Sequence, residues 1–230
     1  MTLERVIVEP DVRILRPDFA VLALAVSGLA NGPSDAQSEA WLRGAEDHAR
    51  AAGAALPAQI VSWQEAYRAF GAKPQRTASS VEALWKRALA PGLPRVNWLV
   101  DLYNAVSVRH GLPVGGEDLA RFAGPIRLAR ATGTEAFDTV KDGQQMADPP
   151  APGEVVWADD LGVTCRRWNW RQGTRTRLTD QSTTALFLLE RLAPLPLEAL
   201  EAAGDALLAM IRSRTPGVQV ERTRFGPYSS

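Results

Sequence analysis

The chain contains few residues that bind metals or form cross-links: one cysteine, Cys165, and two histidines, His48 and His110, among 230 residues. A disulfide needs a pair of cysteines, so a small secreted protein held together by disulfides is excluded. A zinc site of the cysteine type needs several thiolates, and a histidine-rich metal cluster needs more imidazoles than the chain has. The sequence also lacks a phosphate-binding glycine loop and a dinucleotide fingerprint. We therefore expect neither a metal nor a cofactor.

Neither sign of charge is in excess, because 26 lysines and arginines balance 26 aspartates and glutamates. A surface that coats nucleic acid needs excess positive charge to neutralise phosphates, so we expect no DNA partner. The balance is uneven along the chain, since residues 161–179 hold five arginines and no acidic residue. Any contact with RNA is therefore expected from this local patch.

The apolar run of residues 19–30 is too short to cross a bilayer, which needs about 20 apolar residues. It also begins late for a signal peptide and follows four acidic residues. A buried strand is the better explanation of the run. We therefore expect a cytoplasmic protein without membrane contact.

Hydrophobic periodicity and turn residues predict helices mainly before residue 110 and strands mainly after it. Asp142-Gly143 is typical of a hairpin turn. This order favours an α+β fold, with mixed or antiparallel sheet layers and flanking helices, in a single domain over residues 1–230. The expected helices are 35–52, 63–70 (capped by Ser62), 80–90, 97–110 and 197–213. The expected strands are 5–8, 12–15, 19–27, 126–130, 154–157, 163–171, 185–192 and 218–224.

Polar residues on the expected helix at residues 97–110 form the first candidate site. Spacing of i, i+4 and i+7 places three of them on one face of an otherwise apolar helix: Asn97, Asp101 and Asn104. Such a stripe faces either water or a polar cavity, and the pattern leaves both possibilities open. The next turn favours a cavity, because glycines let backbone approach a ligand closely. That turn contains Gly115, Gly116, Glu117 and Asp118.

Arginines and tryptophans on the expected strand at residues 163–171 form the second candidate site. Alternation on a strand places Arg166, Trp168 and Trp170 on one face, and Arg167, Asn169 and Arg171 on the other. Guanidinium and indole planes together can stack bases or hold a carboxylate or a phosphate. The structural alternative is equally open: the tryptophans pack in the core and the arginines pair with acids of the adjacent strand, Glu154, Asp159 and Asp160.

Cys165 lies in the same segment and is a possible nucleophile. It would need a nearby base, for which His110 is the plausible histidine. A lone cysteine on an apolar strand is more often a packing residue, and we favour that interpretation.

Three stretches of sequence resemble the editing domain of the bacterial phenylalanyl-tRNA synthetase beta subunit, which has freestanding relatives. They are Asn97–Ser107, Leu112–Asp118 and Cys165–Arg171, and the resemblance extends over residues 63–194. It implies a hydrolase site that accepts an amino acid wrongly attached to tRNA and cleaves the ester. The chain departs from the synthetase at two points: Gly115 replaces a histidine, and residues 166–172 replace a glycine-rich run that ends in glutamate.

The resemblance also implies roles for the candidate residues. Asn104, Glu117 and Asn169 would supply the donors and the carboxylate of a catalytic site. The substrate would be the acceptor end of tRNA or an amino-acid-like ligand. Its expected contacts are Asn97, Asp101, Gly115, Gly116, Arg166, Arg167, Trp168 and Arg171.

Three functional hypotheses remain open. The leading one is a stand-alone editing factor that deacylates mischarged tRNA. The second is a module that binds an aminoacyl-tRNA end or a free amino acid without chemistry, which the missing histidine and glutamate favour. The third is a hydrolase of small esters, which the neutral net charge favours over RNA.

Overall fold

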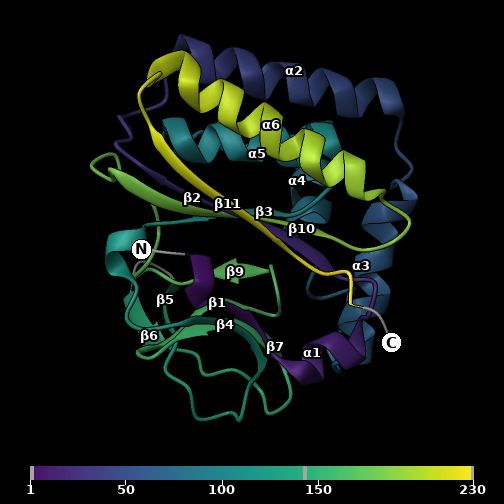
Figure 1. Ribbon diagram of the computed structural model, residues 1–230. Helices are drawn as coiled ribbons and strands as arrows, with labels where there is room; N and C mark the ends of the chain where they lie inside the picture. The colour runs from purple at the N-terminus through teal and green to yellow at the C-terminus, as the bar shows by residue number, and fades with distance from the viewer. Residues whose placement is uncertain (1–2, 142–143, 229–230) are drawn as a thin grey trace.

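The chain is arranged in three layers, seen edge-on in Figure 1. The computed structural model describes residues 3–141 and 144–228. Helices cover one face of a four-stranded antiparallel sheet, and a five-stranded mixed sheet lies on its other face. Helices α5 (Trp98–His110) and α6 (Leu197–Arg214) pack against the four-stranded sheet, and α2 (Ala36–Ala52) packs against α5. The expected α+β class is confirmed.

The middle sheet has the strand order β11-β2-β10-β3, and all neighbouring strands are antiparallel. Its strands are β2 (Ala20–Ser27), β3 (Val114–Glu117), β10 (Thr184–Arg191) and β11 (Gln219–Phe225). β2 and β10 are buried on both faces, one against helices and one against the second sheet. This two-sided burial is the reason that both strands read as continuous apolar runs.

The second sheet has the order β1-β4-β7-β8-β9, in which β1 and β4 are parallel and the other pairs antiparallel. Its strands are β1 (Val6–Val8), β4 (Ile126–Arg130), β7 (Val155–Asp159), β8 (Gly162–Arg166) and β9 (Arg171–Gln172). A separate pair consists of β5 (Asp138–Lys141) and β6 (Gln144–Ala147). The expected Asp142-Gly143 turn lies outside the described residues.

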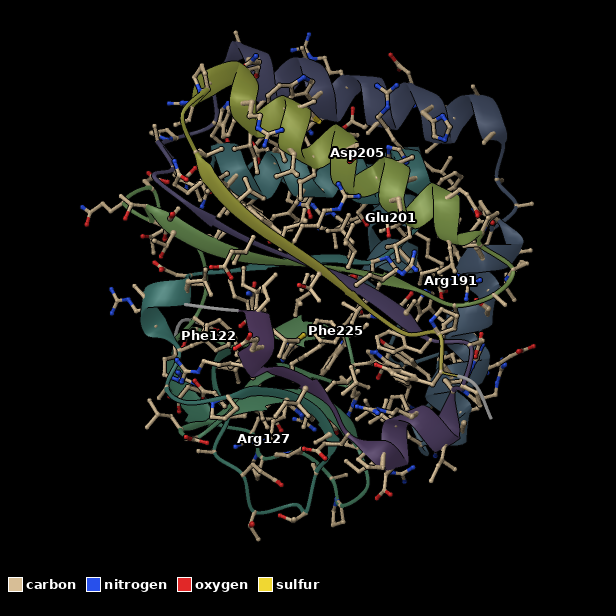
Figure 2. All side chains as sticks on the ribbon, viewed as in Figure 1. Phe122, Arg127, Arg191, Glu201, Asp205 and Phe225 are labelled. Carbon is tan, nitrogen blue, oxygen red and sulfur yellow. The ribbon has the colours of Figure 1, made fainter. Side chains whose placement is uncertain are left out.

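Helix α3 lies at one end of the two sheets (Figure 1), and α4 packs against α2, α3 and α5. The bounds of α3 and α4 are Ala58–Ala69 and Ser80–Leu89, and the short helices are η1 (Leu3–Arg5), α1 (Pro10–Leu15) and η2 (Leu119–Arg121). Polar contacts fasten the outer helix layer to the sheet: Glu201 and Asp205 on α6, labelled in Figure 2, both pair with Arg222 on β11.

Capping side chains set the starts of three helices. Asp35 accepts hydrogen bonds from two backbone N–H groups at the start of α2, Ser79 from one in α4, and Asn97 from one in α5. Gly111 ends α5 in the left-handed conformation that favours glycine (φ +66°). The starts expected for these helices are confirmed.

Two expected elements are wrong near the start of the chain. Residues 12–15 belong to helix α1 and not to a strand, because Pro10 in the first turn has a φ that suits a helix and needs no N–H partner there. Helix α3 begins at Ala58 and not after Ser62, since Pro57 already sets the helix entry. The Ser62 hydroxyl therefore lies inside the helix, where it donates to the Gln59 carbonyl.

The strand expected at residues 163–171 is also wrong, because the backbone leaves the sheet after Arg166. Arg167 and Trp168 have φ values of +47° and +69°, which an extended strand excludes. The turn aims the Trp168 side chain into the core. There its ring lies 5.1 Å from Phe19 and 5.5 Å from Trp63, in edge-on contacts. The expected alternation of side chains between two strand faces therefore does not exist here.

We expect Trp63→Ala to lower the free energy of unfolding by about 3–5 kcal/mol, because it leaves a cavity beside the rings of Phe19 and Trp168. Val61→Ala, on the exposed side of the same helix, should change it by less than about 0.5 kcal/mol. Urea unfolding of both variants measures the difference. Equal effects of the two substitutions would contradict this packing.

Candidate functional site

A cavity of about 340 Å³ opens between the two sheets, beside edge strand β3. This volume lies in the range of pockets that hold small molecules. Helices α4 and α5 and the segment before α5 form part of its wall. Residues of β3, β7, β8, β9 and β10 form the rest together with the turn after β8. Its polar lining comes from Tyr103, Asn104, Glu117, Asn169, Gln172 and Glu190, and its aromatic lining from Trp157, Trp168 and Trp170.

Glu117 is a buried carboxylate in this cavity, with 4% of its surface exposed. The hydroxyl of Thr164 donates to Oε1 over 3.2 Å, and the hydroxyl of Thr176 donates to Oε2. Burial, opposed in part by these hydrogen bonds, raises the pKa of Glu117 to about 7. The side chain therefore exchanges a proton near neutral pH, which suits a general base.

Glu190 is a second buried carboxylate in the same cavity, 2% exposed. Trp157 Nε1 donates to its Oε1 over 2.8 Å, and Asn169 Nδ2 donates to its Oε2 over 2.7 Å. Burial raises the pKa of Glu190 to about 8, and the negative charge of Glu117 adds to the increase. The sequence-based prediction missed this residue, although an acid inside the apolar run 185–192 was a signal.

The two amide side chains of the cavity differ in what they contact. Asn169 is occupied at both ends: its Oδ1 accepts from the Tyr67 hydroxyl over 2.8 Å while its Nδ2 donates to Glu190. Asn104 is 6% exposed and lines the cavity, and within the described residues its side chain makes no hydrogen bond. Asn104 is therefore available to a ligand.

The two glycines expected to approach a ligand lie in β3. Gly115 lines the cavity, and nothing lies within 4 Å of where a Cβ atom would stand. Gly116 is packed closely, because a Cβ atom there would be 2.8 Å from the Tyr103 ring, and its carbonyl accepts from Gln172 Nε2. Gly115 thus borders the cavity, and Gly116 allows Tyr103 to approach the strand.

Asn97 and Asp101 of the polar stripe lie outside the cavity lining and have structural partners. Asn97 caps α5 and donates to the Leu178 carbonyl. Asp101 accepts from the Ser38 hydroxyl over 3.0 Å and from the Val96 N–H over 2.9 Å. Two residues of the stripe, Asn97 and Asp101, therefore connect elements of the fold, and the third, Asn104, lines the cavity.

Arg166 also lies outside the cavity lining. Its guanidinium donates to both oxygens of Glu154 over 2.8 Å and pairs with Asp148 over 2.7 Å. Arg175 likewise forms a two-pronged pair with Asp159. The structure thus contains the pairs between arginines and acids of neighbouring strands that the structural alternative anticipated.

The turn after β8 separates the cavity from a second, basic recess of about 250 Å³. Trp168, Asn169 and Trp170 line the cavity, whereas Arg167 lines the recess. Guanidinium groups lie over the Trp170 ring, that of Arg167 at 4.4 Å and that of Arg171 at 4.3 Å. Lys73 and Arg76 add positive charge to the recess, and neither has an ion-pair partner within the described residues.

Cys165 lines the cavity, but burial raises the pKa of its thiol well above the usual range. Within the described residues, no histidine lines the cavity to act as its base. In residues 3–141 and 144–228 there is no cluster of three or more metal-binding side chains. Among the helices of that same part of the chain, none has the length and apolarity to span a membrane.

We expect Glu190→Gln to reduce the pH dependence of stability. A carboxyl whose pKa is raised on folding stabilises the native state fully below about pH 4.5, and this contribution is lost as pH rises through about 8. The free energy of unfolding of the wild type should therefore decrease between about pH 5 and pH 8.5. In the variant this decrease should be smaller by about 2–4 kcal/mol. Urea unfolding across this range measures both. Parallel curves would contradict an unusual proton affinity at Glu190.

Comparison with known proteins identifies the family. The family model described as the B3/4 domain matches residues 62–211, well over half of the chain. Among solved structures, the fold is similar to an N-terminal fragment of the phenylalanyl-tRNA synthetase beta subunit from Pyrococcus horikoshii. That match has a TM-score of 0.52 and 13% identity, and it covers 96% of this chain but 54% of the fragment. No curated protein sequence matches significantly. The resemblance expected from the sequence is confirmed, and the chain belongs to the B3/4 domain family.

Proposed function

We propose that this protein hydrolyses, in trans, the ester bond between a tRNA and a wrongly attached amino acid. One observation carries the proposal: a cavity of amino-acid size brings Asn104, Glu117 and Asn169 together within the residues that the family model matches. These three residues were expected at a catalytic site from the sequence. The chain spans about half the length of the synthetase fragment, so the activity of a whole synthetase does not transfer to it.

In this proposal the aminoacyl group enters the cavity and the ribose stays at its mouth. Glu117 accepts a proton from a water molecule, whose oxygen bonds to the ester carbon. The Asn104 amide donates to the negatively charged oxygen that forms there. The bond from carbon to the ribose oxygen then breaks, and Glu117 returns the proton to that oxygen. Asn169 acts through Glu190, which it holds by a hydrogen bond.

The basic recess supports RNA as the carrier of the ester. Arg167, Lys73 and Arg76 lie on the side of the turn away from the cavity, so an acceptor end that delivers its ester there brings phosphates near them. The guanidinium planes of Arg167 and Arg171, which lie over the Trp170 ring at the boundary, offer surfaces on which a base can stack. The zero net charge is compatible with this arrangement because the charge is local.

The direct test is to incubate the purified protein with a panel of misacylated tRNAs and follow loss of the ester. We expect release from one or a few of them, and a loss of about 10²–10³-fold in rate for Asn104→Ala. Gln37→Ala, an exposed substitution on α2, should keep the wild-type rate. No release from any tRNA, in conditions where a synthetase editing control is active, would refute the hydrolase.

The RNA interaction has its own test. The double variant Lys73→Gln/Arg76→Gln should bind an acceptor-end RNA more weakly, and each lost phosphate contact should reduce the slope of log affinity against log salt by about 0.7–1. Arg109→Gln/Arg212→Gln removes the same charge from the helix layer and is the matched control. Filter binding at several salt concentrations measures the slopes. Equal salt dependence of RNA affinity for the two variants would show that RNA does not bind at the basic recess.

A binding module is the second candidate function, favoured by one feature of the cavity. Gly115 stands where the resembling synthetases have a histidine, so an imidazole does not reach the cavity from that position. Tight binding of an aminoacyl-tRNA end without turnover over long incubation would select this function over hydrolysis.

A further inference from the structure

Two of the residues that line the cavity are buried carboxylates whose hydrogen-bond donors are all neutral. Glu117 accepts hydrogen bonds from the hydroxyls of Thr164 and Thr176. Glu190 accepts hydrogen bonds from the indole N–H of Trp157 and the side-chain amide of Asn169. Within the described residues, neither carboxylate has a cation within 4 Å. A buried charge without a counter-ion is costly, so each carboxylate needs either a proton or a cation from outside the chain.

A positive charge that acts on Glu117 is already paired with an acid of the fold. The guanidinium of Arg175 is close enough to lower the pKa of Glu117 slightly, but it is held by both oxygens of Asp159. Arg166 is held in the same way by Glu154. The other titratable groups that act on the pair are the thiol of Cys165 and the phenols of Tyr67 and Tyr103, none of which carries a positive charge. The cavity therefore keeps an excess of negative charge whenever its glutamates are ionised.

The remaining lining is what a cation-binding pocket needs. Each carboxylate oxygen receives one protein donor and keeps capacity to accept another. Trp157 and Trp168 also line the cavity, and aromatic faces attract cations that lie over them. The Asn104 amide also lines the cavity and has no hydrogen bond in the described part of the chain, so it can contact a polar ligand there.

We propose that the cavity binds the free ammonium group of an aminoacyl ester or amide, with Glu190 and Glu117 as its counter-ions. This inference rests on the proposed function for the identity of the ester, but the binding step does not depend on hydrolysis. A free amino acid is a poorer ligand, because its carboxylate would add a third negative charge to the cavity. Hydrolysis creates that carboxylate, so the same charges favour release of the product.

Binding of the ammonium must also release protons. A cation beside Glu117 and Glu190 favours their ionised forms, and at neutral pH both carboxyls hold protons for part of the time. The heat of binding will therefore vary with the ionisation enthalpy of the buffer.

The test uses isothermal titration calorimetry at about pH 7 with a panel of L-amino-acid amides, which mimic the ester without hydrolysing. Each amide is paired with its N-acetyl derivative and with the free amino acid. We expect at least one amide to bind, with proton release, and both counterparts to bind at least about tenfold more weakly. Equal affinity for the N-acetyl derivative, or no binding by any amide, would overturn the proposal.

Variants locate the interaction. Glu190→Gln should weaken amide binding at least about tenfold and reduce proton release, whereas Glu198→Gln, exposed on α6, should change neither. The wild-type comparison of amide with N-acetyl amide keeps the proposal testable if Glu190→Gln does not fold. Amide binding without deacylation would leave this inference standing and remove the hydrolase. Deacylation at the same rate for N-acetylated and free aminoacyl-tRNA would support the hydrolase and overturn the ammonium site.

Discussion

Burial of Trp168 is the interaction on which the site depends. To place this ring against Phe19 and Trp63, the chain takes up positive φ at Arg167 and Trp168, a conformation that costs of order 1–3 kcal/mol per non-glycine residue. Hydrogen bonds offset part of this cost: the Trp168 N–H donates to the Val155 carbonyl over 2.6 Å, and the Arg167 N–H donates to Glu154. Packing of a whole indole contributes the rest.

The same turn separates opposite charges. With Trp168 pointing inward, Asn169 reaches Glu190 inside the cavity, and Arg167 points to the recess with Lys73 and Arg76. A chain with no net charge thereby presents buried acids on one side of a short turn and bases on the other. Under the proposed function, this pattern complements an aminoacyl-tRNA end, which carries an ammonium at its tip and phosphates behind it.

Ion pairs with acids near β7 explain why two of the five arginines of the basic stretch are not available to a ligand. Arg166 and Arg175 each hold a carboxylate of β7 or of the residue before it, with both partners largely removed from water. Removing one partner of such a pair leaves an uncompensated buried charge, so these arginines serve the fold first. Arg171, which lies over Trp170, and Arg167 remain at the boundary of the cavity.

The sequence by itself determined the class of the fold and pointed to part of the candidate site. Two-sided burial makes β2 and β10 continuous apolar runs, and caps such as Asn97 and Ser79 mark where helices begin, because both signals are local. Asn104, Glu117 and Asn169 were found through the helix spacing, the glycine turn and the family resemblance, and the tertiary structure brings them to one cavity.

Tertiary structure alone decided the rest, because it depends on contacts between residues far apart in the chain. The turn at Arg167 follows from a core position for Trp168 that Phe19 and Trp63 create, and strand propensity does not encode it. Glu190 became a site residue because β10 faces β7, where Trp157 meets it. Its proton affinity is set by burial, and burial is a property of the assembled layers.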